Sequence, residues 1–321
     1  MTDHGHRRAQ RAGKASLGMI IVAAMAVIAI AATIAVVRVA GSHSGQQASR
    51  IAPVRYVGVY EKESPKSYSQ VSEFAKAIGR QPNLVGYYSG WDEPFQSAFA
   101  ETAAQHGAAT IVQIDPAGIP LAKVASGAYD SYLTRFATAV AAFGHPVVIS
   151  FGREMNGFWY SWGYHHTPPA VFVAAWRHVV TLFREHGATN VKWLWQVNSN
   201  SGSTGPVRDW WPGAQYVNWV GVSGYYFVST DTFSYIFKPV VADIRQFTHD
   251  PVLIAETAVR PSSGQQRGIR DLFSGLRSQG YLGLAWFDED TPGPVYVGGH
   301  WRIDSDPPAL RMFRDGLAGR N

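Results

Sequence analysis

The sequence predicts a (β/α)8 TIM barrel preceded by a single N-terminal transmembrane helix. Three observations lead to this prediction. An unbroken apolar run lies near the N-terminus, eight short β-rich apolar runs follow it, and longer amphipathic stretches alternate with those eight runs. Eight such units over about 230 residues are the size of one closed α/β barrel. The 321 residues, 46% of them hydrophobic, suffice for one large core and an appendage.

The first 50 residues carry the whole net charge of the chain. They hold six of the 28 basic residues and one of the 23 acidic residues, which leaves 22 of each in the remainder. The formal charge of +5 therefore belongs to this segment, and the rest is neutral. Because nucleic-acid binding needs Lys and Arg clustered on the folded domain, no nucleic-acid partner is expected.

Residues 17–37 carry no charge and are long enough to cross a bilayer. At about 1.5 Å per residue, a helix of this length spans the roughly 30 Å hydrocarbon core. Residues 1–16 are basic and only Arg38 follows closely, so the N-terminus is expected in the cytoplasm and the domain on the other side. The alternative is secretion after cleavage of residues 1–41. The apolar core of a signal peptide is usually about 7–15 residues, and this run is longer, which favours a membrane anchor.

The remainder divides into a linker and one domain. Residues 38–52 are rich in Gly, Ser and Gln and predict a flexible linker before a domain over 53–321. Strands are expected at 55–60, 84–88, 110–114, 147–151, 191–197, 219–226, 252–256 and 282–287. Helices are expected at 69–79, 129–144, 169–187 and 269–280, each ending in a glycine, among others.

A doubly wound open sheet is the structural alternative. It usually has fewer strands and a Gly-rich phosphate turn after its first strand. This chain has EKESPKS at that place, which favours the barrel. The chain also has no cysteine, which excludes disulfides and thiolate metal sites.

The candidate reactive groups are carboxylates at the C-terminal ends of strands, where the active sites of such barrels lie. Glu154 and Glu256 follow the fourth and seventh strands, which face each other across the barrel mouth. Retaining hydrolysis of a glycosidic bond needs two carboxyl groups about 5–5.5 Å apart, one as acid/base and one as nucleophile. Glu61, Asp92, Asp115 and Asp288 also follow strands, and for the first three a charged run, a helix cap and a turn are the favoured explanations.

Aromatic residues gather at the same strand ends and in the loops after them. They are Trp91, Trp159, Tyr160, Trp162, Tyr225, Tyr226 and Trp286. The apolar faces of sugar rings stack on such side chains, whose N–H and O–H groups also form hydrogen bonds. Core packing explains any single one of them equally well, but the whole set at one mouth predicts a carbohydrate ligand.

The segment FGREMNGFWYSWG, residues 151–163, resembles the strand-four signature HEMNG-x-WY-x-W of glycoside hydrolase family 26. The resemblance continues in order through YVNWVGVSGYY, LIAETA and AWFDED, and so covers most of the predicted domain. It implies a retaining, endo-acting glycosidase of the β-mannan or β-glucan class that needs no cofactor or metal.

The resemblance also implies roles for individual residues. Glu154 falls on the acid/base and Glu256 on the nucleophile. Tyr225 is expected to donate a hydrogen bond to the nucleophile, Trp159 to line the sites beside the scissile bond, and Trp286 to form the floor under the sugar. The full set expected to contact substrate is Trp91, Arg153, Asn156, Trp159, Trp162, Tyr225 and Trp286.

Two residues depart from the family pattern close to the predicted chemistry. Arg153 stands where the family has His, and Ser223 stands where it often has Asp. A serine leaves the guanidinium free for substrate or for Glu154. An adjacent cation lowers the pKa of a carboxyl, the wrong direction for an acid catalyst near neutral pH. Either Arg153 binds an acidic or substituted sugar or catalysis is impaired, and the retained glutamates and aromatics favour the first.

A non-catalytic cell-surface glycan-binding protein on the same barrel is the alternative function, and it would need neither glutamate. Other enzyme classes lack support, because the chain has no HExxH, no phosphate-binding loop and no complete nucleophile elbow. His165 and His166 are adjacent and point apart on an extended chain, which predicts a surface pair without metal. The expected partner is a polysaccharide, bound by a monomer.

Overall fold

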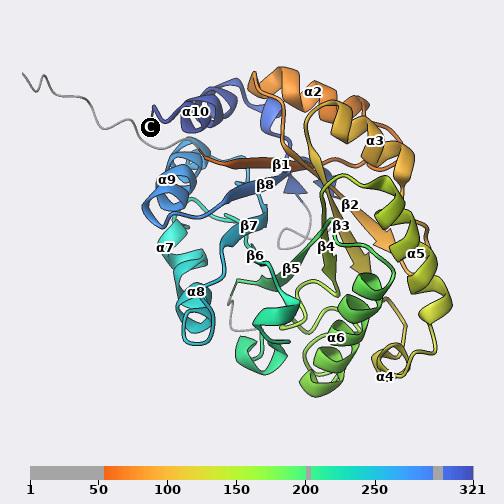
Figure 1. Ribbon diagram of the computed structural model, residues 1–321. Helices are drawn as coiled ribbons and strands as arrows, with labels where there is room; N and C mark the ends of the chain where they lie inside the picture. Colours follow the sequence, from red (N-terminus) through yellow and green to blue (C-terminus); the bar gives the residue numbers. More distant parts are fainter. Residues whose placement is uncertain (1–53, 200–203, 292–298, 321) are drawn as a thin grey trace, which may run out of the picture. The chain divides into compact units, whose positions relative to one another are not determined.

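Eight parallel strands close into a single barrel in chain order, with helices around its outside (Figure 1). This computed structural model describes residues 54–199, 204–291 and 299–320. The strands are β1 (Tyr56–Tyr60), β2 (Leu84–Gly90), β3 (Ala109–Asp115), β4 (Val147–Phe151), β5 (Val191–Asn198), β6 (Trp219–Ser223), β7 (Val252–Thr257) and β8 (Gly283–Phe287). The predicted (β/α)8 barrel is therefore confirmed.

The helices that surround the barrel follow the strands along the chain. They are α2 (Ser69–Ile78), α3 (Ser97–Gln105), α4 (Leu121–Ala125), α5 (Asp130–Phe143), α6 (Pro169–Glu185), α7 (Phe233–Ile236), α8 (Lys238–Ile244), α9 (Gln265–Ser278) and α10 (Pro307–Ala318). Short 3-10 turns lie at Val207–Trp210, Ala214–Tyr216 and Ile303–Ser305, and a two-stranded ribbon pairs β9 (Asp290–Thr291) with β10 (Gly299–His300). Helices α2 and α5 end at glycines in the left-handed conformation, as the sequence predicts.

The strands are apolar on both faces because each face packs into a separate layer. Side chains that point inward, such as Leu84, Ile111 and Leu253, fill the barrel. Those that point outward, such as Trp193 on β5, pack with the helices, including Trp176 of α6 at 6.2 Å between ring centroids. Burial on both faces is the reason that each strand appears in the sequence as a continuous apolar run.

A chain of buried polar side chains crosses the barrel interior near the C-terminal ends of the strands. Gln113 donates to the hydroxyl of Tyr60 at 2.8 Å and to the amide oxygen of Gln196 at 2.7 Å. Gln196 in turn donates to the hydroxyl of Ser223 at 2.9 Å. All four side chains are buried, so their hydrogen bonds satisfy groups that water does not reach.

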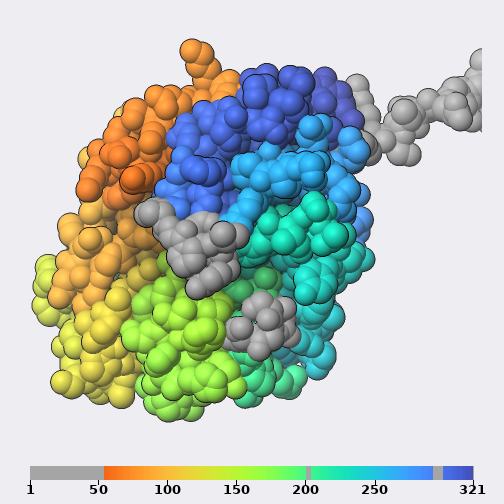
Figure 2. Space-filling view, turned by 180° about the vertical axis from the view of Figure 1, so that it is seen from behind, coloured from red at the N-terminus to blue at the C-terminus, as the bar shows by residue number. Residues whose placement is uncertain are grey.

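Helices α2 and α10, from opposite ends of the domain, lie side by side and complete the helical ring (Figures 1 and 2). Phe74 and Phe313 meet edge to face at 6.3 Å, and Nε of Arg314 donates to the carbonyl of Ala77 at 2.7 Å. These contacts tie the last helix to the first helix that the structure describes.

The predicted transmembrane helix at residues 17–37 and the linker at 38–52 lie outside the described residues. Within residues 54–199, 204–291 and 299–320, no helix combines the length and apolarity that a bilayer span requires.

Candidate active site

The two predicted catalytic glutamates lie at the C-terminal ends of β4 and β7 and are almost fully buried. Each is 5% exposed. Glu256 is the second-last residue of β7, and Glu154 follows β4 by three residues. Burial raises the pKa of Glu256, and the Glu154 carboxyl also acts to raise it, as expected for carboxyl groups in one site.

The backbone of Glu154 has an unusual, left-handed conformation. Its φ is +54°, in the left-handed region that side chains other than glycine rarely adopt. The amide of Glu154 donates to the carbonyl of Gln196 at 2.8 Å, and its own carbonyl accepts from Gly157 at 2.9 Å. Such a conformation costs of order 1 kcal/mol and persists where surrounding contacts hold it, often at functional sites.

Each carboxylate oxygen of Glu154 accepts one hydrogen bond. The indole N–H of Trp159 donates to Oε2 at 2.9 Å, and Nδ2 of Asn198 donates to Oε1 at 3.0 Å. Trp159 reaches back over Gly157, where a Cβ would overlap the indole ring. Because Trp159 is also 39% exposed, it offers a ring to a ligand beside Glu154.

Asn156 was expected to contact substrate. Its side chain instead forms two hydrogen bonds with the backbone of Asn198. Its Nδ2 donates to the carbonyl of Asn198 at 3.0 Å, and its Oδ1 accepts from the amide of Asn198 at 2.8 Å. The Asn156 side chain is fully buried, so it acts on Glu154 only through Asn198. The sequence reasoning missed Asn198, although it is a polar residue at the end of a strand, the signal that selected the glutamates.

The carboxylate of Glu256 accepts hydrogen bonds from two tyrosines. Tyr225 donates to Oε1 at 2.6 Å, and Tyr88 donates to Oε2 at 2.8 Å. Burial raises the pKa of Glu256, while the charge of Arg153 and the two hydrogen bonds lower it. Tyr88, two residues before the end of β2, is a second residue that the sequence reasoning missed.

Arg153 is not free, which corrects the expectation drawn from Ser223. Its Nη2 pairs with Asp115 at 3.2 Å, and its Nη1 donates to the hydroxyl of Tyr160. Ser223 lies in the buried polar chain described above. The sequence analysis explained Asp115 as part of a turn. That explanation is incomplete, because the Asp115 carboxylate forms an ion pair with Arg153.

Trp286 faces away from the barrel interior, which corrects its expected place under the sugar. Its ring meets Phe313 of α10 at 5.2 Å, and its indole N–H donates to the carbonyl of Trp301 at 3.0 Å. Side chains alternate along a strand, and Ala285 points inward, so Trp286 points outward. Phe287 is the aromatic residue of β8 that packs against the interior cluster.

Trp162 and Trp91 pack against protein side chains. Trp162 is buried, stacks on Tyr160 at 4.3 Å and donates to the carbonyl of Arg153 at 2.9 Å. Trp91 is partly buried and packs on Tyr129 at 5.4 Å and on Tyr132 at 4.9 Å. Trp162 therefore supports the residues beside Glu154 and presents little surface to a ligand.

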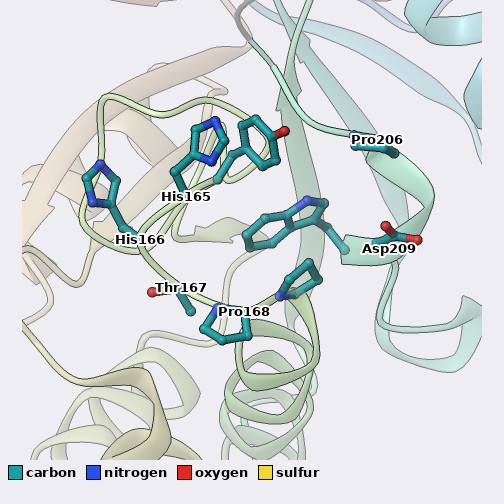
Figure 3. A pocket seen from close by; sticks show the side chains of 9 residues that line it. His165, His166, Thr167, Pro168, Pro206 and Asp209 are labelled. Atoms are coloured by element: carbon teal, nitrogen blue, oxygen red, sulfur yellow. The ribbon is translucent and has the colours of Figure 1, made fainter.

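A surface hollow of about 380 Å³ lies between the loop after β4, the start of α6 and the turn at Val207–Trp210. His165 and His166 lie on its rim with their rings apart (Figure 3). Nε2 of His166 is 2.8 Å from the carbonyl of Phe158, and the ring of His165 packs on Tyr164. The lining holds neither glutamate. No cluster of three or more potential metal ligands occurs in the described part of the chain.

The sequence matches a family and several curated relatives. The profile described as glycosyl hydrolase family 26 matches residues 121–258. Endoglucanase H of Acetivibrio thermocellus is 27% identical over 278 residues, which are 81% of this chain and 30% of the relative. Beta-1,3-xylanase TXYA of a Vibrio species is 30% identical over 175 residues, 50% of this chain and 36% of the relative. The chain thus spans about a third of the length of these relatives.

Solved structures share the fold at low sequence identity. The YdhT protein of Bacillus subtilis superposes with a TM-score of 0.62 at 15% identity, over 83% of this chain and 86% of that one. A modular endo-beta-1,4-mannanase of Cellulomonas fimi gives the same TM-score and identity, over 83% of this chain and 72% of that one. These likenesses establish the barrel fold.

Proposed function

We propose that this chain, a member of glycoside hydrolase family 26, is an endo-acting glycosidase that cleaves a β-linked polysaccharide with retention of configuration. The observation that carries the proposal is the pair of buried carboxyl groups at the ends of β4 and β7. Their surroundings differ, and this difference supports a separate role for each.

Glu256 is suited to be the nucleophile. Two tyrosine hydroxyls hold its oxygens, and the nearby charge of Arg153 favours the ionised carboxylate. Glu154 is suited to be the acid/base, because it lies beside the exposed ring of Trp159, where a bound sugar would place its glycosidic oxygen.

These roles describe a double displacement. Glu154 donates its proton to the glycosidic oxygen while an oxygen of Glu256 attacks the anomeric carbon, so that the leaving chain departs as an alcohol and a glycosyl ester forms. Glu154, now ionised, then takes a proton from water, and the resulting hydroxide displaces Glu256 from the anomeric carbon. The glutamates return to their starting protonation states, and the new reducing end keeps the β configuration.

The relatives bear on the choice of sugar. The names of the two described sequence relatives indicate a glucan and a β-1,3-xylan, whereas the mannanase among the solved structures shares only 15% identity with this chain. We therefore place β-glucans and β-1,3-xylan ahead of β-mannan as substrates.

The direct test is hydrolysis by the full chain of a panel of β-glucans, β-1,3- and β-1,4-xylans and β-mannans. We expect new reducing ends from at least one polysaccharide, and a fall of several orders of magnitude for Glu154→Gln and Glu256→Gln, each folded as the wild type. Binding to a polysaccharide of the panel without release of reducing ends from any of them would favour the alternative of a non-catalytic glycan-binding protein.

We further propose that residues 17–37 anchor the chain in a membrane, with the barrel outside the cytoplasm. The length of the apolar run and the excess of basic residues before it support this proposal.

A further inference from the structure

We propose that Arg153, although it adjoins Glu154 in the sequence, is a positioning residue for Glu256: its guanidinium packs on the Tyr88 ring that orients this nucleophile and places a positive charge beside it. The inference rests on the proposed function, because it assigns Arg153 to the nucleophile of that reaction. It replaces the expectation that Arg153 recognises an acidic sugar.

The guanidinium of Arg153 packs on the ring of Tyr88. The guanidinium carbon lies 4.6 Å from the centroid of the Tyr88 ring, within the range of a cation–π contact. The Tyr88 ring also stacks on Tyr60 at 5.2 Å with 21° between the planes. Held by both neighbours, Tyr88 directs its hydroxyl to Oε2 of Glu256 at 2.8 Å.

The guanidinium is itself held firmly in this place. Asp115 pairs with one of its terminal nitrogens, Tyr160 accepts from the other, and the Tyr160 ring centroid lies 4.8 Å from the guanidinium carbon. Trp162 stacks on Tyr160 and donates to the backbone carbonyl of Arg153. The Arg153 side chain is 12% exposed, so its contacts are with protein groups more than with solvent.

The charge of Arg153 also acts on Glu256 and lowers its pKa. Burial raises the pKa of Glu256, and Arg153 is the largest of the influences that lower it. The other carboxyl groups that interact with Glu256 are Glu154 and Glu289, neither of which supplies a positive charge. The hydroxyl groups around it belong to Tyr60, Tyr88, Tyr160 and Tyr225. Among these groups Arg153 supplies the positive charge.

Loss of the Arg153 charge changes the pKa of Glu256 in a defined direction. A nearby cation stabilises the ionised carboxylate, so neutralising Arg153 raises the pKa of Glu256. Less of the nucleophile is then ionised at low pH. The acid limb of the pH profile, where kcat/KM falls as pH is lowered, therefore moves to higher pH. A residue that only bound substrate would change KM and leave that limb where it was.

The test compares Arg153→Met and Arg153→Lys in the full chain, on a polysaccharide of the panel that the wild type cleaves. For the Met variant we expect the acid limb to move up by about one pH unit or more, and for the Lys variant by clearly less. Tyr88→Phe, which removes one hydrogen bond to Glu256, is expected to shift the limb in the same direction. An unmoved limb in the Met variant, or one that moves down, overturns the proposal.

Arg55→Met is the matched control. Arg55 also lies over a tyrosine ring, 5.2 Å from the centroid of Tyr56, but just before β1, at the opposite end of the strands from the glutamates. This variant is expected to leave the acid limb unchanged. Thermal unfolding shows whether each variant is folded, and Arg153→Gln, which also removes the charge, replaces the Met variant with the same expected shift if the Met variant does not fold.

A second readout separates this inference from the proposed function. The Glu256 carboxyl is titrated by ¹³C NMR, with its signal assigned by loss in Glu256→Gln, in the wild type and the Arg153 variants. If the wild type cleaves nothing on the panel, the proposed function fails, while a raised Glu256 pKa in the Met variant still supports the positioning role. An unchanged pKa there contradicts it whatever the activity.

Discussion

At the scale of single residues, each of the four glutamate oxygens at the barrel mouth has its own donor. Asn198 and Trp159 serve Glu154, and two tyrosines serve Glu256. A carboxylate held by two donors keeps one orientation, which a reaction at a single sugar carbon requires. The donors come from different strands and loops, so the barrel itself sets the geometry.

Asn198 is the donor whose loss is easiest to interpret. Asn198→Ala removes the hydrogen bond to Oε1 of Glu154 and leaves Trp159 in place. Because a hydrogen bond between uncharged groups contributes about 0.5–1.5 kcal/mol and Glu154 donates its proton from the uncharged acid form, we expect kcat/KM to fall about 2- to 10-fold. Steady-state kinetics with thermal unfolding checks this. Unchanged kinetics in a folded variant would show that Asn198 does not position Glu154.

Which of these residues the sequence reveals depends on the type of signal. Glu154, Trp159 and Tyr225 lie in contiguous motifs, so the resemblance identifies them. Tyr88 and Asn198 lie near the ends of β2 and β5, outside any motif, and only closure of the barrel brings them to the glutamates. Trp286 was expected under the sugar, but its side chain lies on the outer side of β8. A motif identifies a residue without stating which side of the strand its side chain occupies.

At the scale of elements, two buried carboxyl groups lie just after the ends of β1 and β8. Glu61 and Asp288 are 3% and 1% exposed, and the amide of Ile303 donates to Asp288 at 2.6 Å. Burial raises the pKa of Glu61 to about 9 and that of Asp288 to about 6. The pair thus keeps a proton near neutral pH and ties the turn at Ile303–Ser305 to the barrel.

This pair predicts a dependence of stability on pH. The folded-state pKa of Glu61 lies above its ordinary value of 4.5, so its contribution is fully present below pH 4.5 and is lost as pH rises towards 9. Glu61→Gln cannot ionise, and we expect it to melt near the wild type at pH 5 and about 3 °C or more above it at pH 9. Thermal unfolding across this range checks the prediction.

The control for that experiment is Glu63→Gln, a nearby exposed carboxylate. It is expected to follow the wild type at every pH. If Glu61→Gln also follows the wild type, the pair does not share a proton in the folded protein.

The strands could be predicted from the sequence, whereas the short helices α7 and α8 were harder to recognise. Each outcome has its own physical reason. Strands buried on both faces appear as apolar runs, whereas α7 and α8, with 4 and 7 residues, are too short to show a helical period. β6 ends at Ser223, earlier than its β-rich sequence predicts. A Cβ on Gly224 would lie 2.7 Å from Ile236 and Phe237, so a residue without a side chain lets the backbone pass close to them just after the strand.

At the scale of the whole molecule, the division of charge and apolarity predicts a membrane-attached barrel. The full chain is expected to sediment with membranes and to be released by detergent but not by high salt, because the attachment is apolar. A chain that starts at Ile51 is expected in the soluble fraction with the same activity. Recovery of the full chain in the soluble fraction, uncleaved, would contradict the anchor.

The proposed double displacement needs two glutamates with different roles, and azide distinguishes them. Glu154→Ala and Glu256→Ala are each supplied with azide and an activated aryl β-glycoside of a sugar that the wild type cleaves. For the Glu154 variant we expect rescue with a β-glycosyl azide, formed by azide attack on the glycosyl ester of Glu256. For the Glu256 variant we expect an α-glycosyl azide, formed by direct attack on the substrate. NMR of the products reads the configuration. The opposite assignment of products, or no azide product from either variant, would contradict the proposed roles.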